Sequence, residues 1–472
     1  MKKISNSLSG LTVITVSLLT ALAVLNSCGV YKKYQSQTEV PKDLYGQLPD
    51  GPIANDSIVN IVDITWREFF TDPRLQQLIS QALENNTDLQ SARLTVEKAQ
   101  ASLRAAKLAW LPSLYLAPSA ALSGTVSSTG AVSAPTYSYS IPLQLDWSPG
   151  ISNSVIVNKR KAQAVLEQAQ AQREATQANI IATVAQHYYT LMMLDRQLEI
   201  LLLTDSLWDV SLETQKALWE NGRTYSTAVN QMESSNLSVK MQIVDTRRSI
   251  VSVENSLCKV LAITPQRIAR NEWGEYKLPQ RFGMGVPALL LEKRPDIRVA
   301  DQVLAEAFYN TASARAAFFP AFNLSGLLGW TNNGGVIADP GAFLMQIAAS
   351  LMQPIFAQGK LTAGLKIAKY NQKDKLNQYV QTVLNAGNQV NEALADCQKA
   401  QEKDVLYKRQ VKVLQDAYAG THELMDNGKA SYIEVLTAQE SLLSAQLNEA
   451  SNLFNGAQAL IELYIALGGA TE

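Results

Sequence analysis

Histidine and cysteine are scarce in this 472-residue chain, which contains two histidines and three cysteines. Metal centres and nucleophilic triads are built largely from these residues, so little material exists for either. The sequence also has no nucleophile motif and no glycine-rich phosphate loop. These absences argue against an enzyme such as a hydrolase, and no cofactor or metal is expected. His187 and His422 stand alone within helical patterns and are interpreted as packing or surface residues.

An excess of charge of one sign is lacking too, because 41 lysines and arginines stand against 42 aspartates and glutamates. Nucleic acid is therefore not expected as a partner. With 47% apolar and 18% charged residues, the chain is long enough for two ordinary domains or one large elongated unit.

The N-terminus has the three regions of a secretory signal, with Lys2 and Lys3 before an apolar run and small residues before Cys28. This order resembles a bacterial lipoprotein signal peptide at residues 1–27, in which Cys28 is lipidated and becomes the mature N-terminus. The alternative is a transmembrane anchor with a chance cysteine, although the run is barely long enough to span a bilayer. Residues 28–60 are polar and rich in Pro, Gly and Asp, which predicts an extended N-terminal arm.

The two remaining thiols, Cys258 and Cys397, each lie in a helical apolar pattern. Buried free cysteine is the common outcome for such positions, and we expect it here. A disulfide between them is the alternative in an oxidising compartment.

Helix breakers are missing from two very long stretches, since neither proline nor glycine occurs between Gly150 and Gly222 and no proline follows Pro354. Helices of about 65 to 70 residues would span about 100 Å. Apolar residues at spacings of three and four indicate coiled-coil packing along these rods. Matched turns end them, at Asn221-Gly222-Arg223 and at Asn427-Gly428-Lys429, and a return helix follows each.

Between the helices the apolar period changes from 3.6 to 2, in residues 114–147 and again in residues 322–351. Each segment predicts a β-hairpin with an apolar, aromatic-ended face, which is typical of membrane barrels. Strands of a soluble half-buried sheet are the alternative. Because four strands cannot close a membrane barrel, which needs about eight, several copies must pool their hairpins.

The same arrangement occurs twice. Three residues of a predicted helix, and the proline that ends it, recur in similar form 208 positions later in the sequence (296 − 88 = 208). This constant offset indicates an internal duplication. We assign the repeats to residues 61–264 and 289–472, joined by a crossover linker at 265–288. The residues that recur are Asp88, Ala92, Lys107 and Pro112, which reappear as Asp296, Ala300, Arg315 and Pro320.

The second repeat opens with a motif that resembles the bacterial outer-membrane factor family, the TolC-like efflux ducts, and especially its lipidated NodT/OprM-like branch. A second motif near the start of the first repeat looks like the corresponding N-terminal motif, and the resemblance covers nearly all of the mature chain. The first motif is Gly285-x-Pro287-x-Leu289-Leu290-x-x-x-Arg294-Pro295-Asp296-Ile297-Arg298-x-Ala300 with Phe319-Pro320, and the second is Trp66-Arg67-x-Phe69-Phe70-x-Asp72-Pro73-x-Leu75 with Asn86-x-Asp88-Leu89.

The resemblance implies a mainly α fold with a membrane β-barrel portion. In that fold a homotrimer forms a twelve-stranded β-barrel in the outer membrane, continuous with a periplasmic α-helical barrel. The chain would be the exit duct of a tripartite efflux system, fed by a periplasmic adaptor (membrane fusion) protein and an inner-membrane pump of the resistance-nodulation-division type. Alternatives are the duct of a type I protein secretion system and, from another class, a secreted coiled-coil adhesin.

The resemblance also implies a periplasmic gate where the return helices begin, and adaptor contacts at the preceding turns. Thr437 and Ala228 stand where related ducts often carry aspartate, which leaves Glu434 as the charged gate position. Glu434 also has capping-box spacing from Ser431, which is an alternative explanation for it. The gate positions are Glu434, Thr437, Ala228 and Gln231, and the adaptor-contact turns are Gly222, Arg223, Gly428 and Lys429.

Overall fold

The computed structural model describes residues 32–36, 65–126, 128, 130, 133, 135–149, 154–272, 294–332 and 342–469. The expected signal peptide, Cys28 and most of the crossover linker lie outside these residues. The chain divides into two compact units. Unit 1 comprises Met1–Thr38, Val96–Ala169 and Ala300–Tyr379, and unit 2 comprises Glu39–Thr95, Gln170–Val299 and Val380–Glu472. Each unit therefore draws on both expected repeats.

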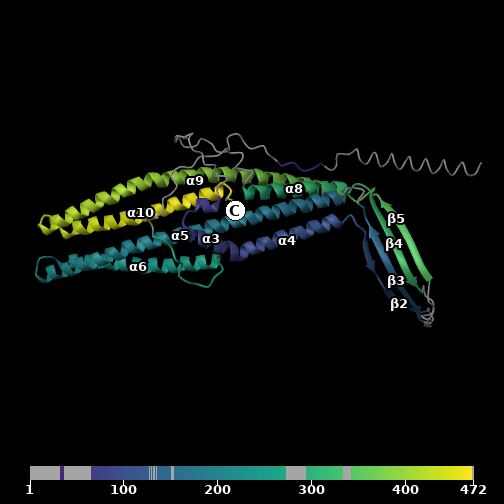
Figure 1. Cartoon of the computed structure of the whole chain (residues 1–472), viewed down its shortest axis with the longest axis horizontal. Helices are drawn as coiled ribbons and strands as arrows, with labels where there is room; N and C mark the ends of the chain where they lie inside the picture. The colour runs from purple at the N-terminus through teal and green to yellow at the C-terminus, as the bar shows by residue number, and fades with distance from the viewer. Residues whose placement is uncertain are drawn as a thin grey trace, which may run out of the picture. The chain divides into compact units, whose positions relative to one another are not determined.

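Helices predominate, and the strands gather in one sheet within unit 1 (Figure 1). The helices are α2 (Trp66–Phe69), α3 (Pro73–Asn85), α4 (Thr87–Leu108), α5 (Ser154–Glu220), α6 (Ser226–Val260), α8 (Pro295–Ala316), α9 (Lys360–Asp426) and α10 (Tyr432–Ala466). The strands are β1 (Ser113–Leu116), β2 (Ser119–Ser123), β3 (Thr136–Trp147), β4 (Ala321–Thr331) and β5 (Ala342–Met352). Among the helices in the described ranges, none has the length and apolar character needed to cross a bilayer.

Corresponding helices have equal lengths, with 22 residues in α4 and α8, 67 in α5 and α9, and 35 in α6 and α10. Helix α8 starts 208 residues after α4 (295 − 87 = 208), whereas α9 starts 206 residues after α5 (360 − 154 = 206). The segment between α4 and α5 is therefore two residues longer than the segment between α8 and α9. These are the segments that contain the hairpins. Helices of one length in both halves fit an internal duplication.

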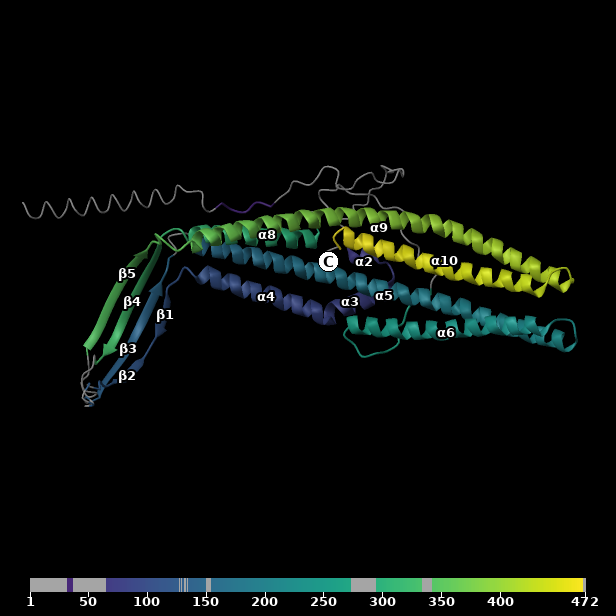
Figure 2. The same cartoon turned by 180° about the vertical axis from the view of Figure 1, so that it is seen from behind.

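All strand pairs in the sheet are antiparallel, in the order β1-β3-β4-β5, and β2 also pairs with β3 (Figures 1 and 2). Residues 114–147 were predicted to form one hairpin with two strands, but its first strand is divided into β1 and β2, which pair with β3 in one register. Two prolines explain the division. Pro118 lies in the gap, and Pro142 accepts a hydrogen bond from the amide of Ala117 at 3.1 Å but has no N–H to return.

The register places one apolar face across the whole sheet. Leu143 of β3 lies opposite Leu328 of β4, which lies opposite Met345 of β5. At one end of the same face Trp330 and Phe343 are paired with ring centroids 5.1 Å apart. Many of these side chains are exposed in the single chain. The alternation read from the sequence is confirmed, and it leaves a large apolar surface that no other described part of the chain covers.

Within the described strands the sheet has two edges, formed by β1 with β2 and by β5. Neither edge pairs with another described strand. Each of them therefore presents backbone donors and acceptors that a further strand can bind.

The core of unit 2 packs α2 and α3 against α5 and against the C-terminal halves of α6 and α10. Leu75, Ile79 and Ala82 of α3 are fully buried there and lie at the spacing of one helical face. Cys258 and Cys397 are free and buried, which confirms the expected fate of these thiols. Burial raises the pKa of Cys397 to about 12.

Two glycines of β4 allow a test of the strand register. An alanine Cβ at Gly329 would lie 2.3 Å from the Ile141 carbonyl oxygen and 2.5 Å from the Pro142 Cα, whereas one at Gly326 meets Leu145 Cβ at 3.6 Å. We expect Gly329→Ala to destabilise the protein by about 1–3 kcal/mol because β3 must move away. Gly326→Ala is the matched control, with little expected effect. Thermal unfolding in detergent, followed by tryptophan fluorescence, distinguishes them, and equal midpoints would contradict this register.

Candidate functional site

The two turns that end α5 and α9 have the same backbone geometry. Gly222 and Gly428 have φ angles of 72° and 70°, in the left-handed region that favours glycine. The amide of the next residue, Arg223 or Lys429, donates to the carbonyl five residues earlier at 2.8 Å in both turns. This is the Schellman arrangement, which satisfies the last carbonyls of a helix. All four of these residues are exposed, so both turns present them to solvent.

Just beyond the second turn, Glu434 is exposed and belongs to a capping box at the start of α10. Its carboxylate accepts from the Ser431 amide at 2.6 Å and from the Ser431 hydroxyl at 3.1 Å. Thr437 is exposed one turn later and donates to the Ile433 carbonyl at 2.8 Å. Glu434 therefore does cap α10, which is the alternative explanation for this residue.

The first repeat differs at the matching positions. Tyr225 caps α6 without a side-chain hydrogen bond, and no capping box forms there. Ala228 is half-buried and Gln231 is exposed. The two helix starts therefore share their backbone path but not their charge.

Helices α6 and α10 lie side by side near these positions. The Ser235 hydroxyl donates to Glu440 at 2.9 Å, and the Tyr432 hydroxyl contacts the Met232 sulfur. Val229, Met232 and Leu436 are buried in a common cluster with residues of α5. The structure thus brings the helices that carry Ala228 and Gln231 next to the helix that carries Glu434 and Thr437.

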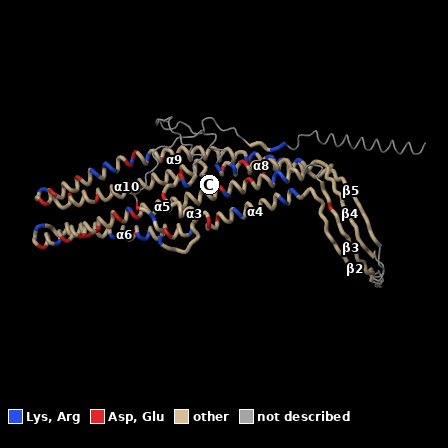
Figure 3. Tube along the Cα trace, viewed as in Figure 1, with Lys and Arg blue, Asp and Glu red and all other residues tan. Residues whose placement is uncertain are grey.

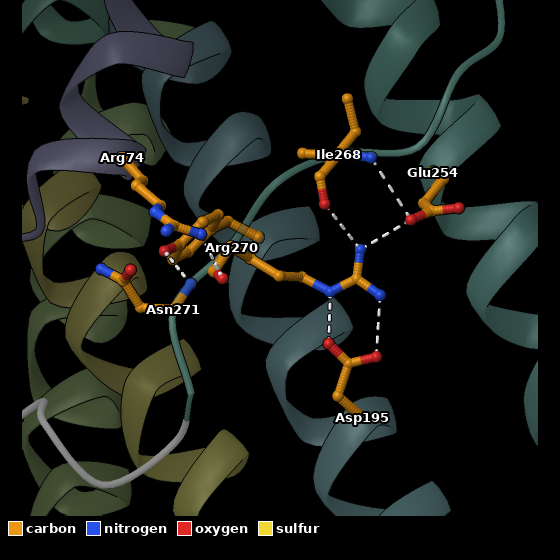
Figure 4. A network of polar contacts seen from close by, with 7 residues as sticks. Arg74, Asp195, Glu254, Ile268, Arg270 and Asn271 are labelled. Carbon is orange, nitrogen blue, oxygen red and sulfur yellow. Dashed lines mark hydrogen bonds and ion pairs between the residues drawn. The ribbon is translucent and has the colours of Figure 1, made fainter.

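A network of polar contacts anchors the start of the crossover after α6 (Figure 4). Arg270 Nη1 lies 2.6 Å from Glu254 of α6, and Nη2 lies 2.7 Å from Asp195 of α5. The hydrogen bond with Asp195 is the main reason that the pKa of Arg270 is raised above its ordinary value. The backbone carbonyl of Arg270 accepts from Arg74 Nη1 at 2.6 Å. One guanidinium therefore holds two long helices and the linker together.

The next residue of the linker completes this network. Asn271 donates through Nδ2 to Asp72 at 3.0 Å, and its amide donates to the Tyr188 hydroxyl at 3.2 Å. The Tyr188 hydroxyl in turn donates to Asp72 at 2.7 Å, while Asp72 caps α3. Burial raises the pKa of Tyr188, so its hydroxyl stays protonated and can donate. Asp72 followed by proline is a local signal for a helix cap, whereas its partners 199 and 116 residues away leave no local pattern.

Equivalent residues lock both repeats at the start of α4 and α8. Asn86 Nδ2 donates to the Val260 carbonyl at 2.8 Å, and Arg294 Nη1 donates to the Ala466 carbonyl at 2.6 Å. Both acceptors are the last residues of the return helices, where a cation or donor is favourable. Arg294 is 3% exposed and also binds Asp296. The junction of the second repeat is thus a structural joint.

Residues 32–36 of the N-terminal arm are described, and they belong to unit 1 without forming a helix or strand. The Tyr34 hydroxyl donates to Asp301 of α8 at 2.7 Å, and the Ser36 hydroxyl donates to the same oxygen at 2.9 Å. The Tyr34 ring packs on Phe308 with centroids 5.7 Å apart. The arm is therefore fastened to α8 a few residues after Cys28.

The histidines take the places expected from the sequence. His187 is half-buried, and its pKa is lowered by burial. His422 is exposed, with Nδ1 3.3 Å from Asp426. In the described part of the chain no three His, Cys, Asp or Glu residues are arranged to hold a metal ion.

Comparison with known proteins gives consistent matches. The family described as "Outer membrane efflux protein" matches residues 78–262 and 286–469. The chain is 28% identical over 473 residues to the toluene efflux pump outer membrane protein TtgC of Pseudomonas putida, which covers 96% of this chain and 95% of that protein. It is also 28% identical over 416 residues to the probable outer membrane lipoprotein SilC of Salmonella typhimurium, covering 86% and 88%.

Solved structures agree with these relatives. The open-state structure of the MtrE outer membrane channel of Neisseria gonorrhoeae matches with a TM-score of 0.81 at 25% identity, over 93% of this chain and 98% of that chain. The fold and the matched segments define an outer-membrane efflux channel and not an enzyme. The chain belongs to the outer membrane efflux protein family. This membership separates it from the secreted adhesin that the sequence also allowed.

The Arg270 network predicts a large effect from one substitution. Arg270→Ala leaves Glu254, which is 7% exposed, without its cation, so we expect a loss of about 2–4 kcal/mol in unfolding free energy. Arg196→Ala is the matched control, because its pair with Glu199 is exposed and should contribute at most about 0.5 kcal/mol. Unfolding in urea, followed by helical circular dichroism, compares the two. Similar losses for both variants would show that the network does not hold the linker.

Proposed function

We propose that the chain is the exit duct of a tripartite efflux system and works as a homotrimer. Three sheets join edge to edge in one twelve-stranded barrel in the outer membrane, and the long helices form a periplasmic helical barrel. The observation that carries this proposal is the sheet of unit 1, which has an apolar exposed face and two unpaired edges. Open edges are not tolerated in lipid, so closure with further copies satisfies them.

Strand length supports the membrane location. Strands β3, β4 and β5 have 12, 11 and 11 residues, and a tilted membrane strand needs about 9–11. Strands β1 and β2 share one register and act as a single strand. Each copy therefore supplies four strands, and three copies supply twelve.

Exposed apolar side chains on the helices of unit 2 support close contact between copies. Met241 and Val244 of α6, and Val405 and Leu406 of α9, are each more than 60% exposed in the single chain. Apolar residues at this exposure are expected to be covered in an assembly. A second copy covers them in the proposed helical barrel.

Partners and anchorage complete the proposal. A periplasmic adaptor contacts the turns at Gly222, Arg223, Gly428 and Lys429, and an inner-membrane pump of the resistance-nodulation-division type delivers substrates.

Cys28 is lipidated after removal of residues 1–27. The docking of Tyr34 on α8 and the lipoprotein name of SilC support this anchor. Repeats at 61–264 and 289–472, with a linker at 265–288, fit the two matched segments.

Co-purification tests the partners. The tagged, lipidated chain is cross-linked in its own cells and isolated, and its partners are identified by mass spectrometry. We expect to recover an adaptor and a resistance-nodulation-division pump. The adaptor is expected because the two turns present exposed cations, Arg223 and Lys429, to a partner. Recovery of a secretion-type ATPase instead would contradict the efflux proposal.

The turn contacts have a matched control. Arg223→Ala with Lys429→Ala should reduce adaptor recovery several-fold. Arg247→Ala with Lys412→Ala removes two exposed cations elsewhere on unit 2 and should not. Equal recovery with both pairs would remove the turns from the adaptor contact.

The gate follows from the trimer. Three Glu434 carboxylates near one axis would attract cations and keep the narrow end polar. Thr437 lies one turn further along α10, and Ala228 and Gln231 are the uncharged equivalents on α6. The capping box is compatible with this role, because the Glu434 carboxylate stays exposed while it accepts from Ser431.

Conductance in planar bilayers separates charge from capping at Glu434. Glutamine can also complete a capping box, so Glu434→Gln removes the charge alone, whereas Glu434→Ala removes both. We expect both variants to lose cation selectivity. Glu423→Gln, an exposed change on the other side of the turn, is the control. Wild-type selectivity in Glu434→Gln would confine Glu434 to capping.

A further inference from the structure

Charge is strongly segregated at the four helix ends that adjoin the sheet, although the whole chain is balanced. The ten residues of α4, α5, α8 and α9 nearest the sheet are residues 99–108, 154–163, 307–316 and 360–369. They contain nine lysines and arginines and no aspartate or glutamate. All four segments belong to unit 1, and Figure 3 shows blue segments where α4, α5 and α8 approach the sheet. We call these four segments the basic collar.

Most of the basic collar is open to solvent in the single chain. Arg104, Lys107, Lys159, Lys360 and Lys366 are all exposed, and Lys161 lies 3.4 Å from Glu306. Among the residues of the sheet strands the sole acid is Asp146, which accepts from the Tyr115 hydroxyl. The collar therefore carries a net positive charge over about 15 Å of each helix.

Apolar and aromatic residues occupy the short links between the collar and the sheet. Trp110 and Leu111 are exposed, and Ile355 and Phe356 are almost fully exposed. The Trp147 indole donates to the Trp110 carbonyl at 2.9 Å, so two tryptophans meet at this junction. Aromatic residues followed by basic residues mark the level where a membrane protein passes from hydrocarbon to headgroups.

The geometry points to a binding surface for anionic phospholipid headgroups, which the basic collar provides to the membrane leaflet on the helix side of the sheet. The inference rests on the proposed membrane location of the sheet. Phosphodiester groups at the leaflet surface complement the collar, and each Lys or Arg near such a surface strengthens binding about fivefold at low salt. Exposed Lys32 and Lys33 of the arm, which is fastened to α8, add to the same charge.

Lipid retention in native mass spectrometry tests this surface. The full-length lipidated protein in detergent is titrated with phosphatidylglycerol or phosphatidylcholine, and the retained lipids are counted. We expect wild-type protein to retain phosphatidylglycerol at least about fivefold better, with the preference falling as salt rises from about 0.05 M to 0.5 M. Equal retention of both lipids by the wild-type protein would by itself overturn the inference.

Two matched fivefold variants locate the preference. Glutamine replaces five of the seven exposed collar cations in one variant and five exposed cations of unit 2 in the other. The preference should fall several-fold in the collar variant and stay at the wild-type value in the control. The collar set is Arg104, Lys107, Lys159, Lys360 and Lys366, and the control set is Arg247, Arg248, Lys403, Arg409 and Lys412.

Conductance of the same preparations separates the possible failures. If the collar variant keeps its lipid preference but loses anion attraction in planar bilayers, the collar lines the lumen and the lipid inference is wrong. If every preparation conducts and wild-type protein shows no preference, the lipid inference alone fails. If the wild-type protein does not conduct at all, the proposed function as a duct is contradicted as well.

Discussion

Backbone hydrogen bonding in the sheet is the constraint on which the rest of this structure depends. The described strands of one copy form four rows in register, with one apolar face and an edge at each side that pairs with no other described strand. In lipid each unpaired N–H or C=O costs several kcal/mol, because no water replaces the missing partner. A single chain therefore cannot be a stable membrane sheet. The proposed trimer removes both edges at once, since each β5 edge meets the β1–β2 edge of the next copy.

The helices are under a different constraint, because their backbone hydrogen bonds are made within each helix and only their side chains need partners. Both repeats have long helices of the same length that end in the same kind of turn. Their ends are fixed by polar contacts at matched places, such as Asn86 to Val260 and Arg294 to Ala466. The Arg270 network adds a joint that holds the crossover against α5 and α6. These contacts hold long helices at fixed registers without any catalytic chemistry.

Much of the fold could be read from the sequence because its signals are periodic. Alternation from Tyr137 to Trp147 predicted β3, and the glycines at 222 and 428 predicted the ends of both long helices. The break between β1 and β2 was missed, since it depends on Pro142 as well as Pro118 and so on cross-strand pairing. Contacts such as Tyr34 with Asp301 join residues 267 positions apart and leave no local pattern. The basic collar was not predicted for a related reason, because its cations are spread over four segments of a chain with balanced charge and only folding brings them together.

The central claim is that edges β1–β2 and β5 of neighbouring copies pair head to tail. Disulfide cross-linking measures this directly, with cysteine at Ser119 of β2 and, in turn, at Leu344, Gln346 or Ala348 of β5, in protein with Cys258→Ala and Cys397→Ala. Oxidation in outer membranes should give covalent trimers for at least one pair and none when β5 alone carries cysteine. Cross-links formed only between two β5 strands, or dimers as the largest product, would contradict the claim.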